Sequence, residues 1–93
     1  MYDIVPSNKF KKDLKLAQSR GYDIELLTTV IEMLAEGKEL PVKYRDHALV
    51  SSRDYKNKRE CHILLDWLLI YEICDNELIL YLTRTGTHSD LFK

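Results

Sequence analysis

The sequence predicts a single α+β domain spanning residues 1–93, with a small antiparallel-rich sheet of about four to five strands backed by a two-helix hairpin. Three observations support this fold class. Apolar residues follow helical spacing in two early segments, they dominate three later runs of strand length, and 93 residues leave room for one core. The expected order is strand, helix, helix, then three or four strands and a short C-terminal turn.

Residues 2–5 are predicted to form the first strand, because Tyr, Ile and Val favour extended backbone and Pro6 ends the run. Ser7 or Asn8 is then expected to cap a helix that ends at Gly21. The apolar stripe of this helix comprises Phe10, Leu14 and Ala17. Its lysines lie largely off the stripe, so we expect them to face solvent.

Asp23 is expected to cap a second helix, and Gly37 fits the position after its last turn. The apolar stripe of this second helix comprises Ile24, Leu27, Val30, Ile31 and Leu34. Since only a few residues separate the two helices, they are predicted to form a hairpin on one face of the sheet.

The pattern changes to strands after Pro41. Residues 44–52 are expected to form a loop with a weak strand at 48–50, and residues 54–58 a polar turn. Apolar strands are predicted at 59–65, 67–74 and 78–83. The first two of these strands meet at a tight turn around Asp66.

The lengths of the apolar runs and the positions of the two cysteines indicate the compartment in which the protein is expected. The apolar runs are too short for a membrane span or a signal peptide, so we expect a cytoplasmic protein without membrane contact. Cys61 and Cys74 both lie inside apolar runs, and two buried free thiols are expected rather than a disulfide.

The charge is arranged in alternating blocks, although the net charge is only −1. Residues 1–20 and 41–62 are net positive, whereas residues 21–40 and 63–93 are net negative. A nucleic-acid-binding protein would place the two basic blocks on one face. The alternative is an ordinary solvated surface of mixed sign.

Histidines are the main candidates for proton transfer near neutral pH, and they are His47, His62 and His88. Within the predicted strand, Glu60 and His62 share one face, which makes that face polar. Arg84 can hold a phosphate group through its planar fork, and Phe92 offers a ring on which a base can stack. These residues can form one active site only if strand pairing brings them together.

Each of these residues also has an ordinary structural interpretation. A histidine is often a surface residue, Asp66 suits a turn, Trp67 suits the core, and Arg84 suits an ion pair with Glu72 on the neighbouring strand. No Cys-x-x-Cys or His-x-x-x-His spacing is present, so neither a metal nor a cofactor is expected.

Four ordered motifs closely resemble the YafQ family of the RelE/ParE superfamily of bacterial type II toxins, over nearly the whole chain. The motifs are Tyr44-Arg45-Asp46-His47-Ala48-Leu49, Tyr55-Lys56 through Arg59-Glu60-Cys61-His62-Ile63, Asp66-Trp67-Leu68-Leu69-Ile70-Tyr71, and Arg84 through Phe92. One departure is Leu65, where the family more often has a proline before the aspartate.

The resemblance implies a RelE-like fold and an mRNA endoribonuclease that cuts in the ribosomal A site without a metal. The catalytic positions that it implies are His47, His62, Asp66, Arg84, His88 and Phe92. Candidates for contact with RNA or the ribosome are Lys9, Lys11, Lys12, Lys15, Lys56, Arg59 and Trp67. The implied partners are a cognate antitoxin, the 70S ribosome and mRNA, with operator DNA reached only through the antitoxin complex.

Two alternatives remain open from the sequence. The same superfamily contains ParE-like proteins that poison DNA gyrase on a similar fold. A catalytically degenerate toxin that only binds its antitoxin is the other alternative. Cleavage of mRNA on ribosomes would separate the endoribonuclease from both.

Overall fold

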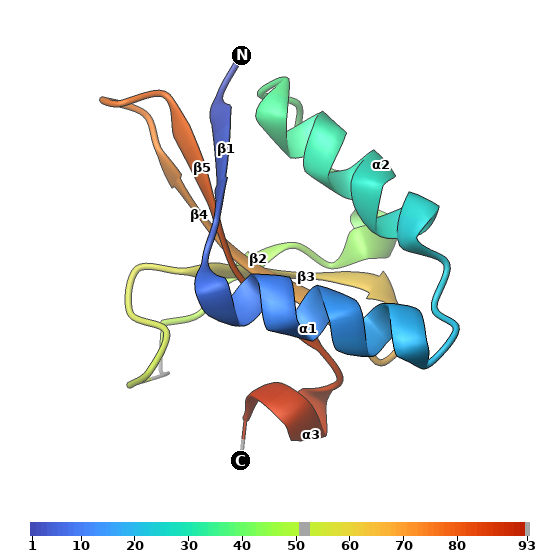
Figure 1. Ribbon diagram of the computed structural model, residues 1–93. Helices are drawn as coiled ribbons and strands as arrows, with labels where there is room; N and C mark the ends of the chain where they lie inside the picture. The colour runs from blue at the N-terminus through green and yellow to red at the C-terminus, as the bar shows by residue number, and fades with distance from the viewer. Residues whose placement is uncertain (51–52, 93) are drawn as a thin grey trace.

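A five-stranded mixed sheet in the order β1-β5-β4-β3-β2 forms the centre of the protein, in a computed structural model that describes residues 1–50 and 53–92. The elements are β1 (Asp3–Pro6), α1 (Asn8–Ser19), α2 (Ile24–Ala35), the 3-10 turn η1 (Val42–Tyr44), β2 (His47–Ala48), β3 (Arg59–Leu64), β4 (Trp67–Cys74), β5 (Ile79–Gly86) and α3 (His88–Leu91). β1 pairs with β5 in parallel, and the other pairs are antiparallel. The predicted fold class and element order are confirmed (Figure 1).

Both helices begin where the sequence predicts. The Ser7 hydroxyl accepts a hydrogen bond from the Phe10 amide at 2.9 Å, and the Asp23 carboxylate accepts one from the Glu25 amide at 3.1 Å. Each side chain thereby satisfies a helix-terminal N–H group that has no partner within the helix. Gly21, with φ +80°, follows α1 in the left-handed backbone conformation that glycine adopts most easily.

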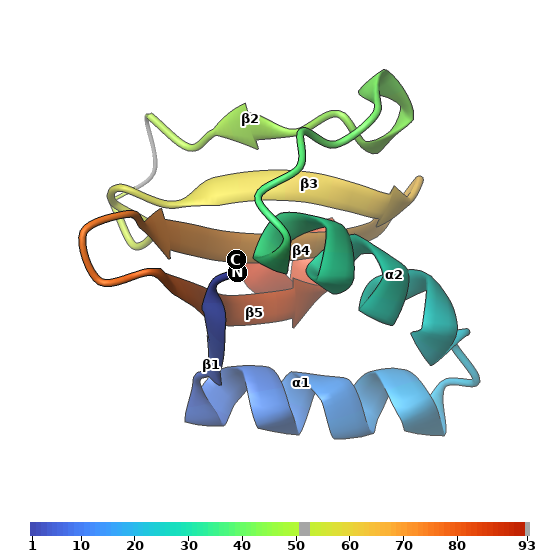
Figure 2. The ribbon, with the colours of Figure 1, turned by 90° about the horizontal axis from the view of Figure 1, so that it is seen from above.

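The two long helices cover the same face of the sheet and enclose the main core. Figure 2 shows β2, β3, β4 and β5 side by side, with α1 beyond β5 and α2 across the strands. The core residues from the helices are Phe10, Ala17, Leu27, Val30, Leu34 and Ala35, and those from the strands are Cys61, Ile63, Trp67, Leu69, Tyr71, Leu80 and Leu82. Alternate residues of each strand therefore point toward the helices.

The opposite face carries a smaller apolar cluster, which the C-terminal segment covers. Its buried members are Tyr55, Leu68, Ile70 and Leu91, with Leu49 and Phe92 packed against them. The candidate site lies on the same face of the sheet as this cluster.

Several strand ends differ from those expected: β1 covers Asp3–Pro6 and not 2–5, and β3 ends at Leu64 and not at residue 65. β5 continues to Gly86 instead of ending at residue 83, because Gly86 pairs with Leu68 of β4. β2 covers only His47–Ala48 and not 48–50. The predicted loop 44–52 begins at Tyr44, the last residue of η1. Residues 51–52 of this loop lie outside the described residues. The C-terminal turn is the one-turn helix α3.

Cys61 and Cys74 are both free, as expected, although only Cys61 is fully buried. Burial raises the pKa of the Cys61 thiol well above its ordinary range. Across residues 1–50 and 53–92, none of the helices has the length and apolar character that crossing a bilayer requires.

Candidate active site

A buried carboxylate joins two of the three histidines. Glu60, 6% exposed, places Oε2 at 3.3 Å from His47 Nε2 and 3.5 Å from His62 Nε2. Strand pairing causes this arrangement, because His47 of β2 lies opposite Glu60 of β3, and His62 follows two residues later on the same face. The two imidazole rings are 6.5 Å apart. The predicted polar face of β3 therefore exists.

The tautomers of these two rings follow from their other contacts. His47 Nδ1 lies 2.8 Å from the Arg45 carbonyl oxygen, and His62 Nδ1 lies 3.2 Å from the Leu65 carbonyl oxygen. A carbonyl oxygen only accepts hydrogen bonds, so Nδ1 carries the hydrogen in both rings. In both rings Nε2 faces Glu60.

The β3–β4 turn connects His62 with the C-terminal helix. The turn residue Leu65 holds the His62 ring, and Asp66 Oδ1 accepts a hydrogen bond from the His88 amide at 3.0 Å. Asp66 thus fixes the start of α3 through the backbone, and its carboxylate does not orient the His88 ring. The His88 ring lies 4.8 Å from the Phe92 ring, centre to centre. His62 and His88 are therefore brought to one end of the sheet.

Arg84 is held by a residue that the sequence did not point to. Its Nε and Nη2 donate to the two carboxylate oxygens of Asp13 on α1, at 2.7 and 2.9 Å. The Thr85 amide donates to the same carboxylate at 3.1 Å. The hydrogen bonds that Arg84 donates to Asp13 raise the pKa of Arg84 above its ordinary value, so the guanidinium remains charged. The ion pair with Glu72 expected for Arg84 is wrong, because Glu72 pairs with Lys58.

The sheet register places His47, Glu60 and Arg84 in one cross-strand row. His47 lies opposite Glu60, Glu60 opposite Ile70, and Ile70 opposite Arg84. Three strand spacings separate the ends of this row, which is about 14 Å. This is the separation of the backbone positions at the two ends of the row, and it is on the scale of a short single-stranded segment lying across the strands.

A groove beside Arg84 contains a second cation and an aromatic residue, together with the carboxylates of Asp54 and Asp90. Lys9 of α1, Tyr55 and Arg84 line it together with Leu91 and Asp90. Lys9 is exposed, as are Lys11, Lys12, Lys15 and Lys56. Lys9 is thus the one member of the predicted α1 group that the described structure places in the same groove as Arg84.

The C-terminal segment is fixed by a set of polar contacts. Thr87 and Asp90 form a capping box at the start of α3. Arg20 Nη1 donates to Asp90 Oδ2 at 2.8 Å, and the Tyr55 hydroxyl donates to the Leu91 carbonyl at 2.9 Å. The Tyr55 ring also packs edge-on against Phe92 at 5.3 Å. These contacts hold His88 and Phe92 beside the sheet.

Two predicted RNA-contact residues lie away from this face. Trp67 is 2% exposed on the helix side, where its indole N–H donates to Thr85 Oγ1 at 2.9 Å. Trp67 is therefore a core residue, and its side chain is not placed for the direct contact with RNA that was expected. Arg59 pairs with Asp46 on the side of the sheet that α2 covers. Since β-strand residues alternate faces, Arg59 points away from its neighbour Glu60.

Sequence reasoning missed three residues that organise the site: Asp13, Tyr55 and Glu60. Glu60 gave a signal, since it shares a strand face with His62. Tyr55 stands in one of the motifs that resemble the family, but neither Tyr55 nor Asp13 was assigned a role, because their partners are distant in the chain. Among the described residues, no three His, Cys, Asp or Glu side chains are arranged to hold a metal ion.

Comparison with known proteins identifies the family of the chain. A family model described as "Bacterial toxin of type II toxin-antitoxin system, YafQ" matches residues 2–93. A protein named mRNA interferase toxin YafQ from Escherichia coli strain B / BL21-DE3 is 43% identical over 91 residues, which cover 97% of this chain and 95% of the relative.

Solved structures give the same result. The metal-bound toxin from Helicobacter pylori superposes with a TM-score of 0.91 at 44% identity, covering 99% of this chain and 100% of that chain. The E. coli DinJ-YafQ complex superposes with a TM-score of 0.89 at 41% identity and covers 100% of both chains.

Proposed function

The chain belongs to the YafQ family of bacterial type II toxins, and from this we propose that it is an endoribonuclease that cleaves mRNA in the ribosomal A site and is inhibited by a cognate antitoxin. One observation carries the proposal: a shared carboxylate, Glu60, lies between His47 and His62 on the sheet face that also bears Arg84. Relatives named mRNA interferase support the reaction type. We place the activity in the bacterial cytoplasm, where mRNA is translated.

The reaction needs three groups around one phosphodiester. A base removes the proton of the ribose 2′-OH, the 2′ oxygen attacks phosphorus, the bond from phosphorus to the 5′ oxygen breaks, and an acid gives that oxygen a proton. The products are a 2′,3′-cyclic phosphate and a 5′-OH end. Each well-placed acid or base contributes on the order of 10²–10⁴-fold.

The histidines supply the proton transfers in this proposal. In His47 and His62 the free Nε2 faces Glu60, so a proton taken up at either Nε2 is stabilised by the same carboxylate. His88 lies on the exposed surface of α3 and is free to approach the scissile bond from the side of the β3–β4 turn. We assign acid and base to these three rings as a group.

Arg84 stabilises the charge that develops on the phosphorane. Asp13 binds the Nε and Nη2 edge of the guanidinium, and Arg84 lines the groove that also contains Lys9. A pre-oriented guanidinium is more effective than a mobile one, because it needs no reorganisation during the reaction. Phe92, beside His88, offers its ring for base stacking.

Contact with the ribosome is assigned to the exposed lysines of α1. Four lysines on one short helix favour phosphate contact with ribosomal RNA, although the chain as a whole is not basic. Operator DNA is reached only through the antitoxin complex in this proposal. The printed description of a relative, the DinJ-YafQ complex, supports an antitoxin partner.

Primer extension on a defined mRNA in a purified translation system tests the proposal. The parent protein is compared with His88→Ala and with Ser89→Ala, the adjacent exposed residue, with and without ribosomes. Ribosome-dependent cuts in the parent and in Ser89→Ala, lost in His88→Ala, are expected. A folded parent that leaves mRNA intact on ribosomes would contradict the proposal.

A further inference from the structure

Arg45 has a backbone conformation that is uncommon for an arginine. It follows η1 with φ 48° and ψ 43°, in the left-handed region that glycine enters most easily. Other residues are held in this region at a cost in stability, and such residues cluster at active sites. Arg45 lies two residues before His47, so its contacts bear on the candidate active site.

The carbonyl group of Arg45 fixes the ring of His47. Its oxygen lies 2.8 Å from His47 Nδ1 and accepts the hydrogen of that nitrogen. Nε2 of the same ring lies 3.3 Å from Glu60 Oε2. Since the backbone angles of Arg45 set the direction of its carbonyl, the left-handed conformation is part of what orients His47. This role uses the backbone and leaves the side chain of Arg45 without an assignment.

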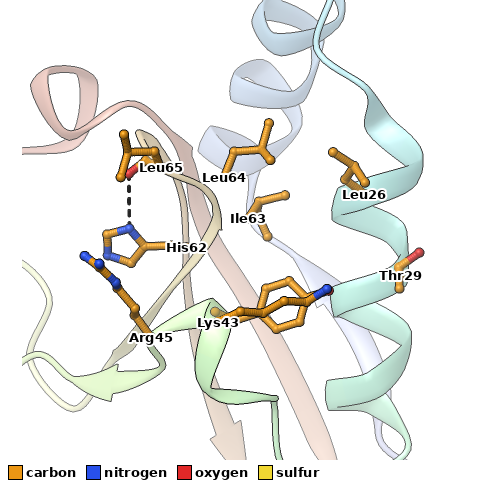
Figure 3. Close-up of a pocket in the computed structure, with 9 residues that line it drawn as sticks. Leu26, Thr29, Lys43, Arg45, His62, Ile63, Leu64 and Leu65 are labelled. Carbon is orange, nitrogen blue, oxygen red and sulfur yellow. Dashed lines mark hydrogen bonds between the residues drawn. The ribbon is translucent and has the colours of Figure 1, made fainter.

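The side chain of Arg45 extends toward the second histidine. Arg45 and His62 line one cavity between α2 and the β3–β4 turn, and Figure 3 shows the guanidinium directed toward the His62 ring. The Leu65 carbonyl holds Nδ1 of that ring at 3.2 Å. Within the described part of the chain, Arg45 forms no ion pair. A guanidinium without an anionic partner therefore lies beside the histidine pair.

The carboxylates near Arg45 are bound by other groups. Glu60 lies between the two histidines, and Asp46 accepts two hydrogen bonds from Arg59. None of the nine residues that line the cavity in Figure 3 is acidic. A guanidinium has five N–H donors in one plane, and they match the oxygens of a phosphate group. The chemistry that complements Arg45 is therefore a phosphate.

We propose that Arg45 binds the phosphate adjacent to the scissile one in the mRNA, while Arg84 binds the scissile phosphate. The row of His47, Glu60 and Arg84 has Arg84 at one end, and Arg45 adjoins His47 at the other end. An RNA strand held by both arginines passes over the histidine pair. The inference rests on the endoribonuclease proposed above and adds a substrate-binding residue to its site.

Single-turnover cleavage of ribosome-bound mRNA by Arg45→Gly tests the role of the side chain. Glycine adopts the left-handed conformation without strain, so the carbonyl should still hold His47 when the guanidinium is removed. We expect the cleavage rate to fall roughly tenfold or more, with the free energy of unfolding near that of the parent. Arg45→Lys keeps the charge but not the planar fork, and it should recover part of the rate.

Lys38→Gln is the matched control, because it removes one exposed positive charge, which pairs with Glu36. It should cleave mRNA like the parent. Parent-like cleavage by Arg45→Gly would overturn the inference and would show that Arg45 acts through its backbone alone.

Substrates with one uncharged phosphate identify the contact directly. A methylphosphonate replaces the phosphate on the 5′ side or on the 3′ side of the scissile bond, one at a time. At one of these positions the parent and Lys38→Gln should slow roughly tenfold or more, whereas Arg45→Gly should slow no further, because the same contact is then removed twice. Additive losses at both positions would overturn the inference.

Binding without cleavage separates this inference from the proposed function. An mRNA with a 2′-deoxy nucleotide at the cleavage site cannot be cut, because the attacking 2′-OH is absent. The affinity of each variant for ribosomes that carry this mRNA should show the same pattern across the methylphosphonate positions. A parent that binds in this way but leaves ordinary mRNA intact would support the inference and refute the proposed enzyme. A parent that cleaves mRNA with a rate and an affinity independent of Arg45 would overturn the inference alone.

Discussion

Asp13 and Arg84 lie 71 residues apart in the chain and meet through two hydrogen bonds of 2.7 and 2.9 Å. Asp13 also accepts the Thr85 amide, so one carboxylate fixes both the side chain of Arg84 and the backbone that follows it. The pair links α1 to β5 at the edge of the candidate site. It makes α1 part of the active-site support as well as a candidate ribosome-binding helix.

Asp13→Asn is expected to lower kcat of mRNA cleavage by about tenfold or more, with a smaller change in KM. The neutral amide no longer holds the guanidinium with two charge-assisted bonds, so Arg84 loses its orientation before the transition state forms. The free energy of unfolding should fall by about 1–3 kcal/mol, because Arg84 loses its anionic partner. Single-turnover cleavage and urea unfolding measure the two effects.

Asp46→Asn is the matched control for Asp13→Asn. Asp46 holds Arg59 through two hydrogen bonds of 3.3 and 3.2 Å, on the face that α2 covers. Its loss should lower stability while leaving cleavage near the parent rate. Equal losses of kcat in the two variants would show that Asp13 acts only through stability.

Glu60→Gln is expected to reduce kcat roughly 10- to 100-fold while preserving the fold. Glutamine has nearly the same shape as glutamate but cannot stabilise a positive charge on His47 or His62 during proton transfer. Glu72→Gln serves as the control, because Glu72 pairs with Lys58 at 2.6 Å and holds no histidine. Parent-like cleavage by Glu60→Gln would remove the shared carboxylate from the mechanism.

The C-terminal helix should loosen at acid pH through Asp90. The Arg20 guanidinium, followed by the Thr87 amide, holds the pKa of Asp90 well below its ordinary 3.8. A carboxyl whose pKa is lowered by folding adds stability above its unfolded pKa, and this stability is lost as pH falls through the folded value. NMR signals of residues 88–92 should therefore lose dispersion between about pH 5 and pH 2 before the core unfolds.

Asp90→Asn tests the origin of this pH response. The variant should show a loosened α3 already at neutral pH and little further change on acidification. Asp54→Asn, an exposed acidic residue in the neighbouring loop, should keep the parent response. A parent-like acid transition in Asp90→Asn would assign the effect to another carboxyl group.

Ribosome binding should fall steeply with salt if the lysines of α1 contact phosphates. Replacing Lys9, Lys11, Lys12 and Lys15 together by glutamine is expected to lower the slope of log affinity against log salt by roughly one per lost phosphate contact. Lys38→Gln is the control, since Lys38 pairs with Glu36 after α2. A flat salt response of the parent would discard ribosome binding through these lysines.

The local parts of the fold could be predicted because their causes lie within a few residues. Ser7 caps the helix that begins next to it, and Asp23 does the same for α2. The apolar stripe of each helix also depends on residues one turn apart. Strand alternation correctly placed Glu60 and His62 on one face.

The site required contacts that no local pattern encodes. The register between β4 and β5 shifts between Ile70 and Tyr71, and Arg84 is aligned with Ile70 after that shift. Continued from the β4–β5 turn without this shift, the register would place Arg84 opposite Leu69, on the other face of the sheet. Trp67 was placed beside the site by resemblance, but its side chain points to the opposite face of the strand.

The parallel pairing of β1 with β5 has a consequence for the synthesis of this protein. Ile4 lies opposite Leu80, so the first strand has no partner in the sheet until the last strand has been translated and has left the exit tunnel. Arg84 and His88 emerge later still. The hydrogen bonds between β1 and β5 are therefore among the last of the sheet to form during synthesis, after the antiparallel partners of β3 and β4 have emerged.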